Sequence, residues 1–219
     1  MRITLSTTTI LTPLACAILP TAALAQTSIT TATTSPVRTS TAGDLSVTST
    51  GSITLNSGAA ITVDSNNSVT NAGTITQGNA NGATGILITD GTSGTITNSG
   101  TISILETYVP SNEDGDTIVD GPIAQASGRA GIWANGAYTG TIVNSGTITL
   151  DGLNSAGIRL DGTLNGSLSN SGAITIIGDN SVGIQAGAIT GNVAIDGAIS
   201  VTGEGASAIK LTGDVGGSI

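Results

Sequence analysis

Short runs of β-branched residues alternate with clusters of Gly, Asn, Asp and Ser along most of the chain. Nearly the same nine residues occur as ITNSGTISI at 96–104, IVNSGTITL at 142–150 and LSNSGAITI at 168–176. Short β-branched runs bounded by turn-forming residues are typical of β-strands. Within each run apolar and polar residues alternate, which predicts strands with one buried side and one solvent-facing side.

These runs recur with a period of about 26 residues. The pattern Asn-(Ser/Ala)-Gly-(Thr/Ala)-Ile occurs four times and a variant, Asp-Gly-Ala-Ile, once, with first residues Asn71, Asn98, Asn144, Asn170 and Asp196. Their spacings are 27, 46, 26 and 26 residues, and 46 equals one unit plus an insertion of 20. A second pattern keeps step with the first and is built around Ile86, Ile132, Ile158, Ile184 and Ile209. With a third apolar position in each unit, the period predicts three short strands and three turns per unit.

A unit of this size cannot bury its apolar face alone. Burial requires the next unit to stack directly on it, so that equivalent strands pair in parallel one coil apart. The sequence therefore predicts an all-β fold, a right-handed parallel β-helix with about three strands per ~26-residue coil, because parallel crossovers are normally right-handed. The repeats occupy 44–219, and we expect the β-helix to be truncated at the C-terminal end.

Alternation also predicts which side chains face inward. In the third strand of a unit, Ile148 and Leu150 are expected to point into the core and Thr149 to point out, as part of a column of hydroxyl side chains. The outward column of the first strand has no common chemistry and consists of Leu87, Trp133, Arg159, Gln185 and Lys210.

The recurring Asn is expected to mark a corner between the second and third strands. Asn and Asp tolerate the left-handed backbone conformation better than other non-glycine residues, and the Gly that follows permits irregular dihedral angles. Stacked corners would bring the side chains into a hydrogen-bonded ladder along the axis. The predicted corner ladder consists of Asn71, Asn98, Asn144, Asn170 and Asp196.

Residues 1–25 have the features of a secretory signal peptide. Arg2 precedes a short apolar run, and Ala23, Leu24 and Ala25 form a small-x-small cleavage site. The Ser/Thr-rich segment 26–43 has almost no apolar periodicity and is expected to be a lead-in or linker. The only cysteine lies inside the signal segment, so the mature chain is expected to contain no disulfide.

Composition narrows the classes of function. The chain has no His, which removes Ser-His-Asp and Cys-His catalysis and imidazole metal ligands. Its net charge is −9 with only 5 Lys and Arg residues, so nucleic acid is not an expected partner. The glycine-rich stretches lack the Gly-Lys-Ser/Thr of a phosphate loop, and the acidic residues of the repeats fall in different turns. No cofactor and no catalytic residues are predicted.

The signal segment, the Ser/Thr-rich lead-in and the iterated NSGTI coils together resemble the passenger region of a bacterial autotransporter, a protein of type V secretion. The resemblance covers about 46–219 and is specific for the repeat architecture. It implies export through the periplasm to the outer membrane, the cell surface or the medium. It also implies a C-terminal outer-membrane β-barrel, encoded downstream of this N-terminal fragment, and the outer-membrane assembly machinery as partners.

The insertion near 107–125, TYVPSNEDGDTIVDGPIAQ, is the main departure from the repeat. Its carboxylates Glu113, Asp114, Asp116 and Asp120 are weak calcium candidates, because a Thr stands where an EF-hand loop requires Gly. A solvated loop is the simpler interpretation. Since solenoids often carry their binding function on insertions, this loop is also the expected binding protrusion.

Two aromatic residues next to the insertion are a candidate binding surface. Trp133 has an outward position and Tyr138 lies in the following turn, and exposed rings of this kind stack on sugars or on side chains of a partner. Packing of Trp133 beneath the insertion is the alternative.

Three functions are compatible with these features. The leading prediction is a non-enzymatic adhesin or stalk at the cell surface, with surface glycans or other cells as candidate partners. The first alternative is a β-helix enzyme that degrades polysaccharides, which requires carboxylates and basic residues on one face. The second is a self-assembling surface-layer or matrix protein, which the low charge and the Thr/Ser columns favour.

Overall fold

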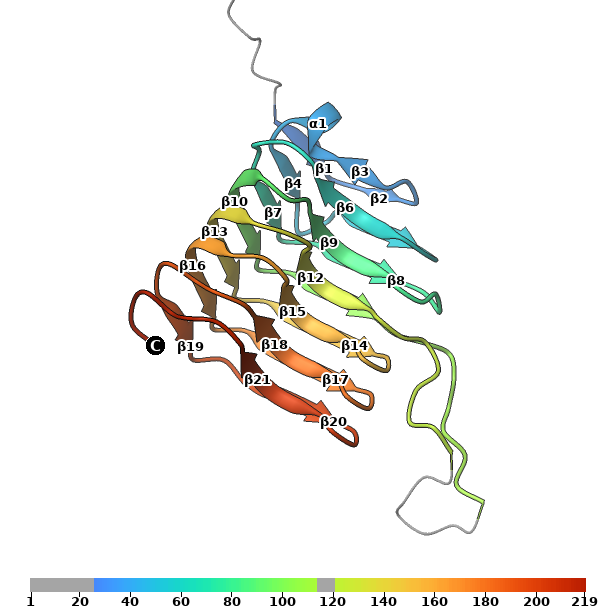
Figure 1. The fold of residues 1–219 in the computed structure, drawn as a ribbon. Helices are drawn as coiled ribbons and strands as arrows, with labels where there is room; N and C mark the ends of the chain where they lie inside the picture. The colour runs from blue at the N-terminus through green and yellow to red at the C-terminus, as the bar shows by residue number, and fades with distance from the viewer. Residues whose placement is uncertain (1–25, 114–120) are drawn as a thin grey trace, which may run out of the picture.

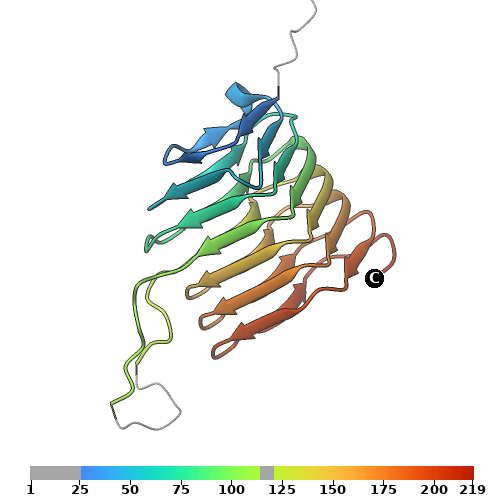
Figure 2. The ribbon, with the colours of Figure 1, turned by 180° about the vertical axis from the view of Figure 1, so that it is seen from behind.

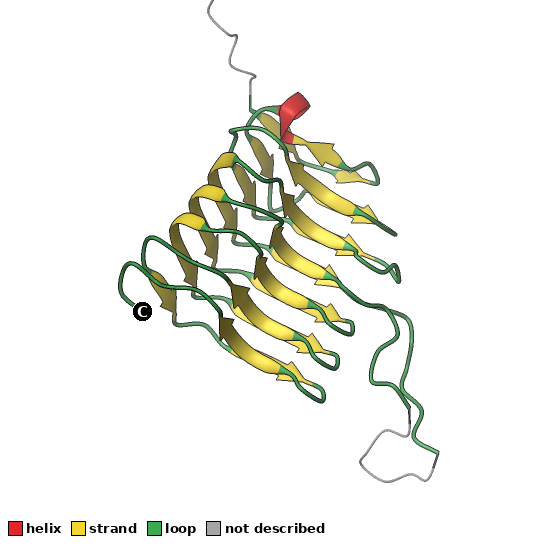
Figure 3. Ribbon diagram, in the orientation of Figure 1, coloured by secondary structure: helices red, strands yellow, loops and turns green. Residues whose placement is uncertain are grey.

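The chain folds as a right-handed parallel β-helix (Figure 1). The structure, a computed structural model, describes residues 26–113 and 121–219. Three parallel sheets of seven strands each run along the axis, and the chain passes through all three before it advances by one coil. Figure 2 shows the same stack from behind, and Figure 3 shows that strands and turns dominate the described part. The predicted fold class is confirmed.

The strands of each sheet follow one another at intervals of one coil. Sheet A contains β1 (Thr27–Ile29), β4 (Leu45–Val47), β7 (Val69–Asn71), β10 (Thr92–Asn98), β13 (Tyr138–Asn144), β16 (Leu164–Asn170) and β19 (Val193–Ile195). Sheet B contains β2 (Ala32–Thr33), β5 (Ser52–Leu55), β8 (Thr74–Gln77), β11 (Thr101–Ile104), β14 (Thr147–Asp151), β17 (Ala173–Ile177) and β20 (Ile199–Thr202). Sheet C contains β3 (Val37–Arg38), β6 (Ala59–Val63), β9 (Thr84–Ile88), β12 (Ala130–Ala134), β15 (Ala156–Leu160), β18 (Val182–Ala186) and β21 (Ser207–Leu211).

Equivalent residues of successive coils stack in register. In sheet A, Ile142 pairs with Ile96 on one side and with Leu168 on the other, and in sheet B, Ile148 pairs with Ile102. These side chains are buried and form a single continuous core along the axis. Burial of an aliphatic side chain of this size contributes about 1.5–3 kcal/mol. Because each coil supplies only a few of them, the core is stable only through stacking between coils.

The outward columns follow the predicted alternation. In sheet C, Trp133 pairs with Leu87 and with Arg159, and all three side chains are partly exposed. In sheet B, Thr149 lies between the buried residues Ile148 and Leu150 and is also partly exposed.

Residues 26–43 form the first coil, so the prediction of a linker was wrong. β1, β2 and β3 pair in parallel with β4, β5 and β6. The short helix α1 (Thr39–Ala42) follows β3 at the N-terminal end of the stack (Figure 1). Thr27 pairs with Leu45, only 18 positions later, so this compressed coil does not repeat the period of about 26 residues that identified the others.

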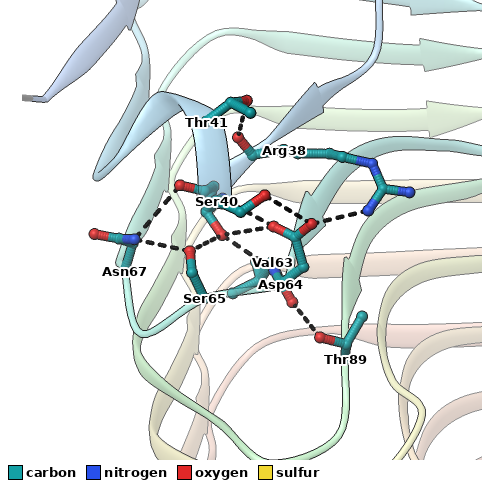
Figure 4. Close-up of polar contacts among 9 residues, drawn as sticks. Arg38, Ser40, Thr41, Val63, Asp64, Ser65, Asn67 and Thr89 are labelled. Carbon is teal, nitrogen blue, oxygen red and sulfur yellow. Dashed lines mark hydrogen bonds and ion pairs between the residues drawn. The ribbon is translucent and has the colours of Figure 1, made fainter. Parts of the chain in front are cut away.

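Asp64, directly after β6, connects α1 to the second coil (Figure 4). Its carboxylate accepts hydrogen bonds from the backbone N–H of Ser40 at 2.9 Å, from the Ser40 hydroxyl at 2.9 Å and from the Arg38 guanidinium at 2.8 Å. The backbone N–H of Asp64 donates to the hydroxyl of Thr39, which is fully buried. Burial alone would raise the pKa of Asp64, but the hydrogen bonds from Ser40 and Arg38, with the charge of Arg38, hold it below the ordinary value of 3.8.

Four of the recurring Asn side chains form a hydrogen-bonded ladder inside the β-helix. Each occupies the last position of a strand in sheet A and is fully buried. Nδ2 of Asn71 donates to Oδ1 of Asn98, Asn98 donates to Asn144, and Asn144 donates to Asn170, each at 2.7 Å. At the end of the ladder, Asn170 donates to the carbonyl of Gly172 at 3.2 Å. The ladder thus lets polar side chains occupy the core, because each side-chain amide finds an acceptor; only Oδ1 of Asn71, at the N-terminal end of the ladder, is buried without a partner among the described residues.

Two parts of the corner prediction were wrong. The ladder residues are extended strand residues, and among the described non-glycine residues only Asn154 and Asn180 have a positive φ, at 50° and 54°. Asp196 is exposed and lies outside the ladder, because the coil is one residue shorter there and Ile195 takes the position opposite Asn170.

The Gly two positions after each Asn is required by close approach between turns. A Cβ atom on Gly146 would lie less than 3.0 Å from the backbone of Gly100, one coil earlier, and a Cβ on Gly172 would meet Gly146 in the same way. None of these three residues has a positive φ. The Asn-Ser-Gly sequence therefore supplies a buried amide and a turn thin enough for the coils to stack at the strand spacing of about 4.8 Å.

Candidate functional site: the base of the insertion

The insertion leaves the β-helix after β11 and returns before β12, at the corner between sheets B and C. It comprises 105–129, of which 105–113 and 121–129 are described. Both views show its two arms running side by side away from the stack (Figures 1 and 2). Its position agrees with the insertion predicted near 107–125.

A carboxylate closes the base of the insertion. Oε1 of Glu106, on the outgoing arm, accepts the backbone N–H of Gln125 at 2.7 Å, and Oε2 accepts the backbone N–H of Ala126 at 2.9 Å. Both oxygens of Glu106 are therefore used to hold the returning arm against the outgoing one. Hydrogen bonds from a backbone N–H to a charged acceptor are stronger than those between neutral groups.

The loop of the preceding coil, between β8 and β9, holds the two arms from the other side. Asn79 and Thr107 exchange two hydrogen bonds, one from the Thr107 backbone N–H at 2.8 Å and one to the Thr107 hydroxyl at 3.0 Å. Oδ1 of Asn81 accepts the backbone N–H of Ser127 at 2.9 Å. The insertion thus starts from a fixed base.

Arg129 anchors the returning arm in the β-helix and is 1% exposed. Its guanidinium donates to the carbonyls of Gly78 at 2.7 Å, Ala80 at 3.1 Å, Asp151 at 2.8 Å and Ile104 at 3.3 Å. Burial lowers the pKa of Arg129, whereas the negative charges of Glu106 and Asp151 act in the opposite direction. The side chain therefore ties the insertion to the coils on both sides of it.

Two cavities lie against this base. The larger has a volume of about 360 Å³ and is lined by Asn79, Asn81, Glu106, Thr107, Tyr108, Gln125 and Ala126. The smaller has a volume of about 200 Å³ and is lined by Glu106, Tyr108, Val109, Pro110, Ile123, Asp151 and Ile177. The smaller cavity is more apolar, and the exposed Val109 and Ile177 are part of it.

Asp151 is the titratable group of the smaller cavity whose pKa is most affected by its surroundings. Burial raises the pKa of Asp151 and the charge of Glu106 raises it further, while a hydrogen bond from the Glu106 backbone N–H and the charge of Arg129 lower it. The net pKa is above 3.8. Paired carboxylates can serve as acid and base, but here both oxygens of Glu106 are bonded to backbone N–H groups. Glu106 and Asp151 therefore form hydrogen bonds that hold the insertion against the β-helix.

The predicted calcium ligands are mostly outside the described residues. Asp114, Asp116 and Asp120 fall in 114–120, and Glu113 is exposed at the edge of this gap. Within 26–113 and 121–219, no cluster of three or more acidic, His or Cys residues could hold a metal ion.

Of the two aromatic residues predicted to form a binding surface, Trp133 is partly exposed and Tyr138 is buried. Trp133 is partly exposed on sheet C, where its Nε1–H donates to Asp161 at 2.8 Å and the guanidinium of Arg159 lies 4.8 Å from the ring centroid. Arg159 also pairs with Asp161 at 2.7 Å. Tyr138, in contrast, is buried in the core, where it pairs with Leu164 of the next coil. Burial raises the pKa of its phenol. The two rings do not form one binding surface.

Sequence reasoning missed Glu106 and Arg129. A signal for Arg129 was available, because it precedes Ser155 by one period of 26 residues and takes the place of a small residue in that column. No comparable signal exists for Glu106, whose partners depend on how the insertion returns.

Comparisons with family models, with curated proteins and with solved structures found no match. Among the described residues, no helix is long and apolar enough to cross a membrane. Function is therefore inferred from the fold, the insertion and the sequence.

Proposed function

We propose that this chain is the rod of a non-enzymatic, exported surface protein of the autotransporter type, which acts as an adhesin or stalk. The observation that carries the proposal is the anchoring of the insertion. Regular coils lie on both sides of it, and Arg129 and Glu106 hold its base rigidly at one corner of the rod. A rigid rod with one fixed protrusion suits display of a binding loop away from the cell surface.

The use of the carboxylates at the insertion base supports a non-enzymatic role. A polysaccharide-degrading β-helix needs a carboxylate that is free to accept or donate a proton at its substrate. Glu106 is committed to two backbone N–H groups, and Asp151 accepts one from Glu106. The proposed partners are surface glycans or other cells, together with the outer-membrane translocator and assembly machinery that proteins of this type use.

Attachment of cells tests the adhesive part of the proposal. The chain is displayed on a bacterium that does not otherwise aggregate, and cell aggregation and attachment to host cells and to glycan-coated surfaces are measured. Replacing 107–125 with a short Gly/Ser turn is expected to abolish attachment, and the matched control, Thr139→Ser on the exposed surface of β13, is expected to preserve it. Equal attachment by cells with and without residues 26–219 would contradict the proposal.

Export is tested separately. Residues 1–25 fused to a reporter enzyme that is active only outside the cytoplasm are expected to give activity, whereas a fusion with Leu14→Arg in the apolar run is expected to give none. Activity independent of residues 1–25 would contradict the export part.

A further inference from the structure

Along β5 to β20, six of the seven strands of sheet B, two columns of positions point outward, and hydroxyl side chains occupy ten of these twelve positions. In the seventh strand, β2, Ala32 continues the first column next to Ser52. The first column is Ser52, Thr74, Thr101, Thr147, Ala173 and Ala198, and the second is Thr54, Thr76, Ser103, Thr149, Thr175 and Ser200. We call this surface the hydroxyl face. Its twelve positions contain no charged and no aromatic side chain, and the next outward positions on β14 and β17 are Asp151 and Ile177.

Strand geometry makes the hydroxyl face a regular grid. Neighbouring positions along a column are one strand spacing apart, about 4.8 Å, and the two columns are two residues apart along each strand, about 6.6 Å. Because every pairing in sheet B is parallel and in register, the grid continues across the insertion: Thr101 pairs with Thr147 and Ser103 with Thr149. The six coils from β5 to β20 therefore place these side chains on one periodic grid.

The hydroxyls of this face have no hydrogen-bond partner within the described part of the chain. Elsewhere hydroxyls are used internally: Thr39 bonds to Asp64, Ser155 to the Leu153 carbonyl and Ser181 to the Gly152 carbonyl. A hydroxyl offers one donor and two acceptor lone pairs, so the hydroxyl face directs a periodic set of unused donors and acceptors toward solvent.

The other two sheets lack such a grid. In sheet A, Val143 and Ala194 interrupt the corresponding column, and the hydroxyls of Ser68 and Ser167 already accept backbone N–H groups. In sheet C, the outward column includes Trp133 and Arg159, which project as large side chains. The regular surface is specific to sheet B.

We propose that the hydroxyl face binds ice. A surface that carries neutral hydroxyls at a regular spacing fits a periodic solid, whereas a small soluble ligand needs a concave site. Sugars are commonly bound on aromatic platforms, and the three aromatic residues of the chain lie elsewhere: Tyr108 in the insertion, Trp133 on sheet C and Tyr138 in the core. Ice presents hydroxyl donors and acceptors in planes with repeats of this order, and the rigid sheet holds its own groups in place before contact.

Ice binding goes beyond the proposed adhesin or stalk function. It requires neither export nor the insertion, so the two ideas fail independently. Ice binding assigns a function to the outer face of sheet B, whereas the adhesin proposal concerns the insertion at one corner of the rod.

Partitioning into growing ice tests the proposal. The purified, folded chain is placed in a solution from which polycrystalline ice is grown slowly, and the protein in the ice and liquid fractions is quantified; the shape of single ice crystals is recorded in parallel. The wild-type chain is expected to enter the ice and to shape the crystals. Thr149→Lys and Thr175→Lys, which each place a long charged side chain on the hydroxyl face, are expected to lose both properties.

Val143→Lys is the matched control, because it places the same side chain outward on the same coil but on sheet A. It is expected to behave like the wild type, and circular dichroism establishes that each variant is folded. The proposal is overturned if the folded wild-type chain stays in the liquid, or if Val143→Lys loses ice binding as fully as Thr149→Lys does. Sedimentation with microcrystalline cellulose or concentration-dependent self-association, in a chain that does not enter ice, would also overturn it.

Discussion

Asn98 donates its side-chain amide to Oδ1 of Asn144 at 2.7 Å, although 46 positions separate the two residues in the sequence. The same bond joins Asn144 to Asn170, 26 positions apart, with the same length. The insertion between the first pair therefore leaves the spacing and register of the coils unchanged. Coil geometry is set by the stacked core and the ladder, and the length of the connection at this corner does not affect it.

Removal of one ladder amide should destabilise the rod from within. In Asn144→Ala, Nδ2 of Asn98 and Oδ1 of Asn170 lose their partner in the core. We expect a loss of about 3 kcal/mol in the free energy of unfolding, since each buried unpaired polar group costs roughly 1–3 kcal/mol. Urea unfolding followed by circular dichroism measures it. Asn165→Ala, at an exposed position of β16, is the control, with an expected change below about 0.5 kcal/mol; equal losses in both variants would rule out the ladder as a stabilising element.

The turn glycine should not tolerate a methyl group. In Gly146→Ala, the new Cβ would overlap the backbone of Gly100, so the two coils must move apart. We expect a loss of about 3 kcal/mol, near the upper end of overpacking costs. Gly82→Ala is the comparison: its φ of 66° is strained for Ala, but the space around it is open, so the expected cost is about 1–2 kcal/mol. Thermal unfolding that ranks Gly82→Ala as the more damaging change would refute the close-approach explanation.

Loss of the buried guanidinium should release the base of the insertion. Arg129→Met keeps much of the apolar stem but leaves four carbonyls without their donor. Limited proteolysis with mass-spectrometric mapping is expected to show faster cleavage within 105–129, and the free energy of unfolding should fall by about 3 kcal/mol or more. Arg159→Met, on the surface of sheet C, should cost at most about 1 kcal/mol and leave the cleavage pattern unchanged. Identical proteolysis of both variants would contradict the anchoring role.

Two carboxylates should respond to pH with opposite signs. The pKa of Asp64 is lowered in the folded chain, so its ionised form stabilises the fold above 3.8, and this stability is lost as the pH falls through the folded-state pKa. The pKa of Asp151 is raised, so its ionisation costs stability at neutral pH, and the cost disappears as the pH falls below 3.8. Asp64→Asn is therefore expected to destabilise the chain near neutral pH, and Asp151→Asn to stabilise it.

Urea unfolding midpoints of the wild type, Asp64→Asn and Asp151→Asn, measured from neutral to acidic pH, check the direction of each change in stability. The two variants serve as controls for each other. Both differences from the wild type should shrink well below pH 3.8. A difference that persists unchanged in acid would show that the substitution acts through packing and not through charge.

The parts of the fold predicted correctly are those that repeat. The inward position of Ile148 and the outward position of Thr149 follow from alternation, and the stacking of Ile142 on Ile96 follows from the period. The first coil was missed because its compressed length falls outside the period.

Another error concerned the start of a strand. Tyr138 was expected in a turn, but it is the first residue of β13 and is buried, and it lies four positions before Ile142, so that alternation places both side chains on the inner side. The equivalent Leu164, one period later, was the available signal that this position is buried. Contacts made once, such as those of Glu106, leave no periodic trace and can be found only in the structure.

The stacked columns make whole coils interchangeable. Residues 145–170 begin and end at the same point of the coil, between one ladder Asn and the next, and removing them would place Asn144 directly before Ser171 with the Asn-Ser-Gly sequence intact. Two core columns would keep the same residue at the new junction, since Ile148 is replaced by Ile174 and Ile158 by Ile184, whereas Leu160 would be replaced by the smaller Ala186. Gain or loss of one such unit changes the length of the rod by a single coil, so its reach can vary while its cross-section does not.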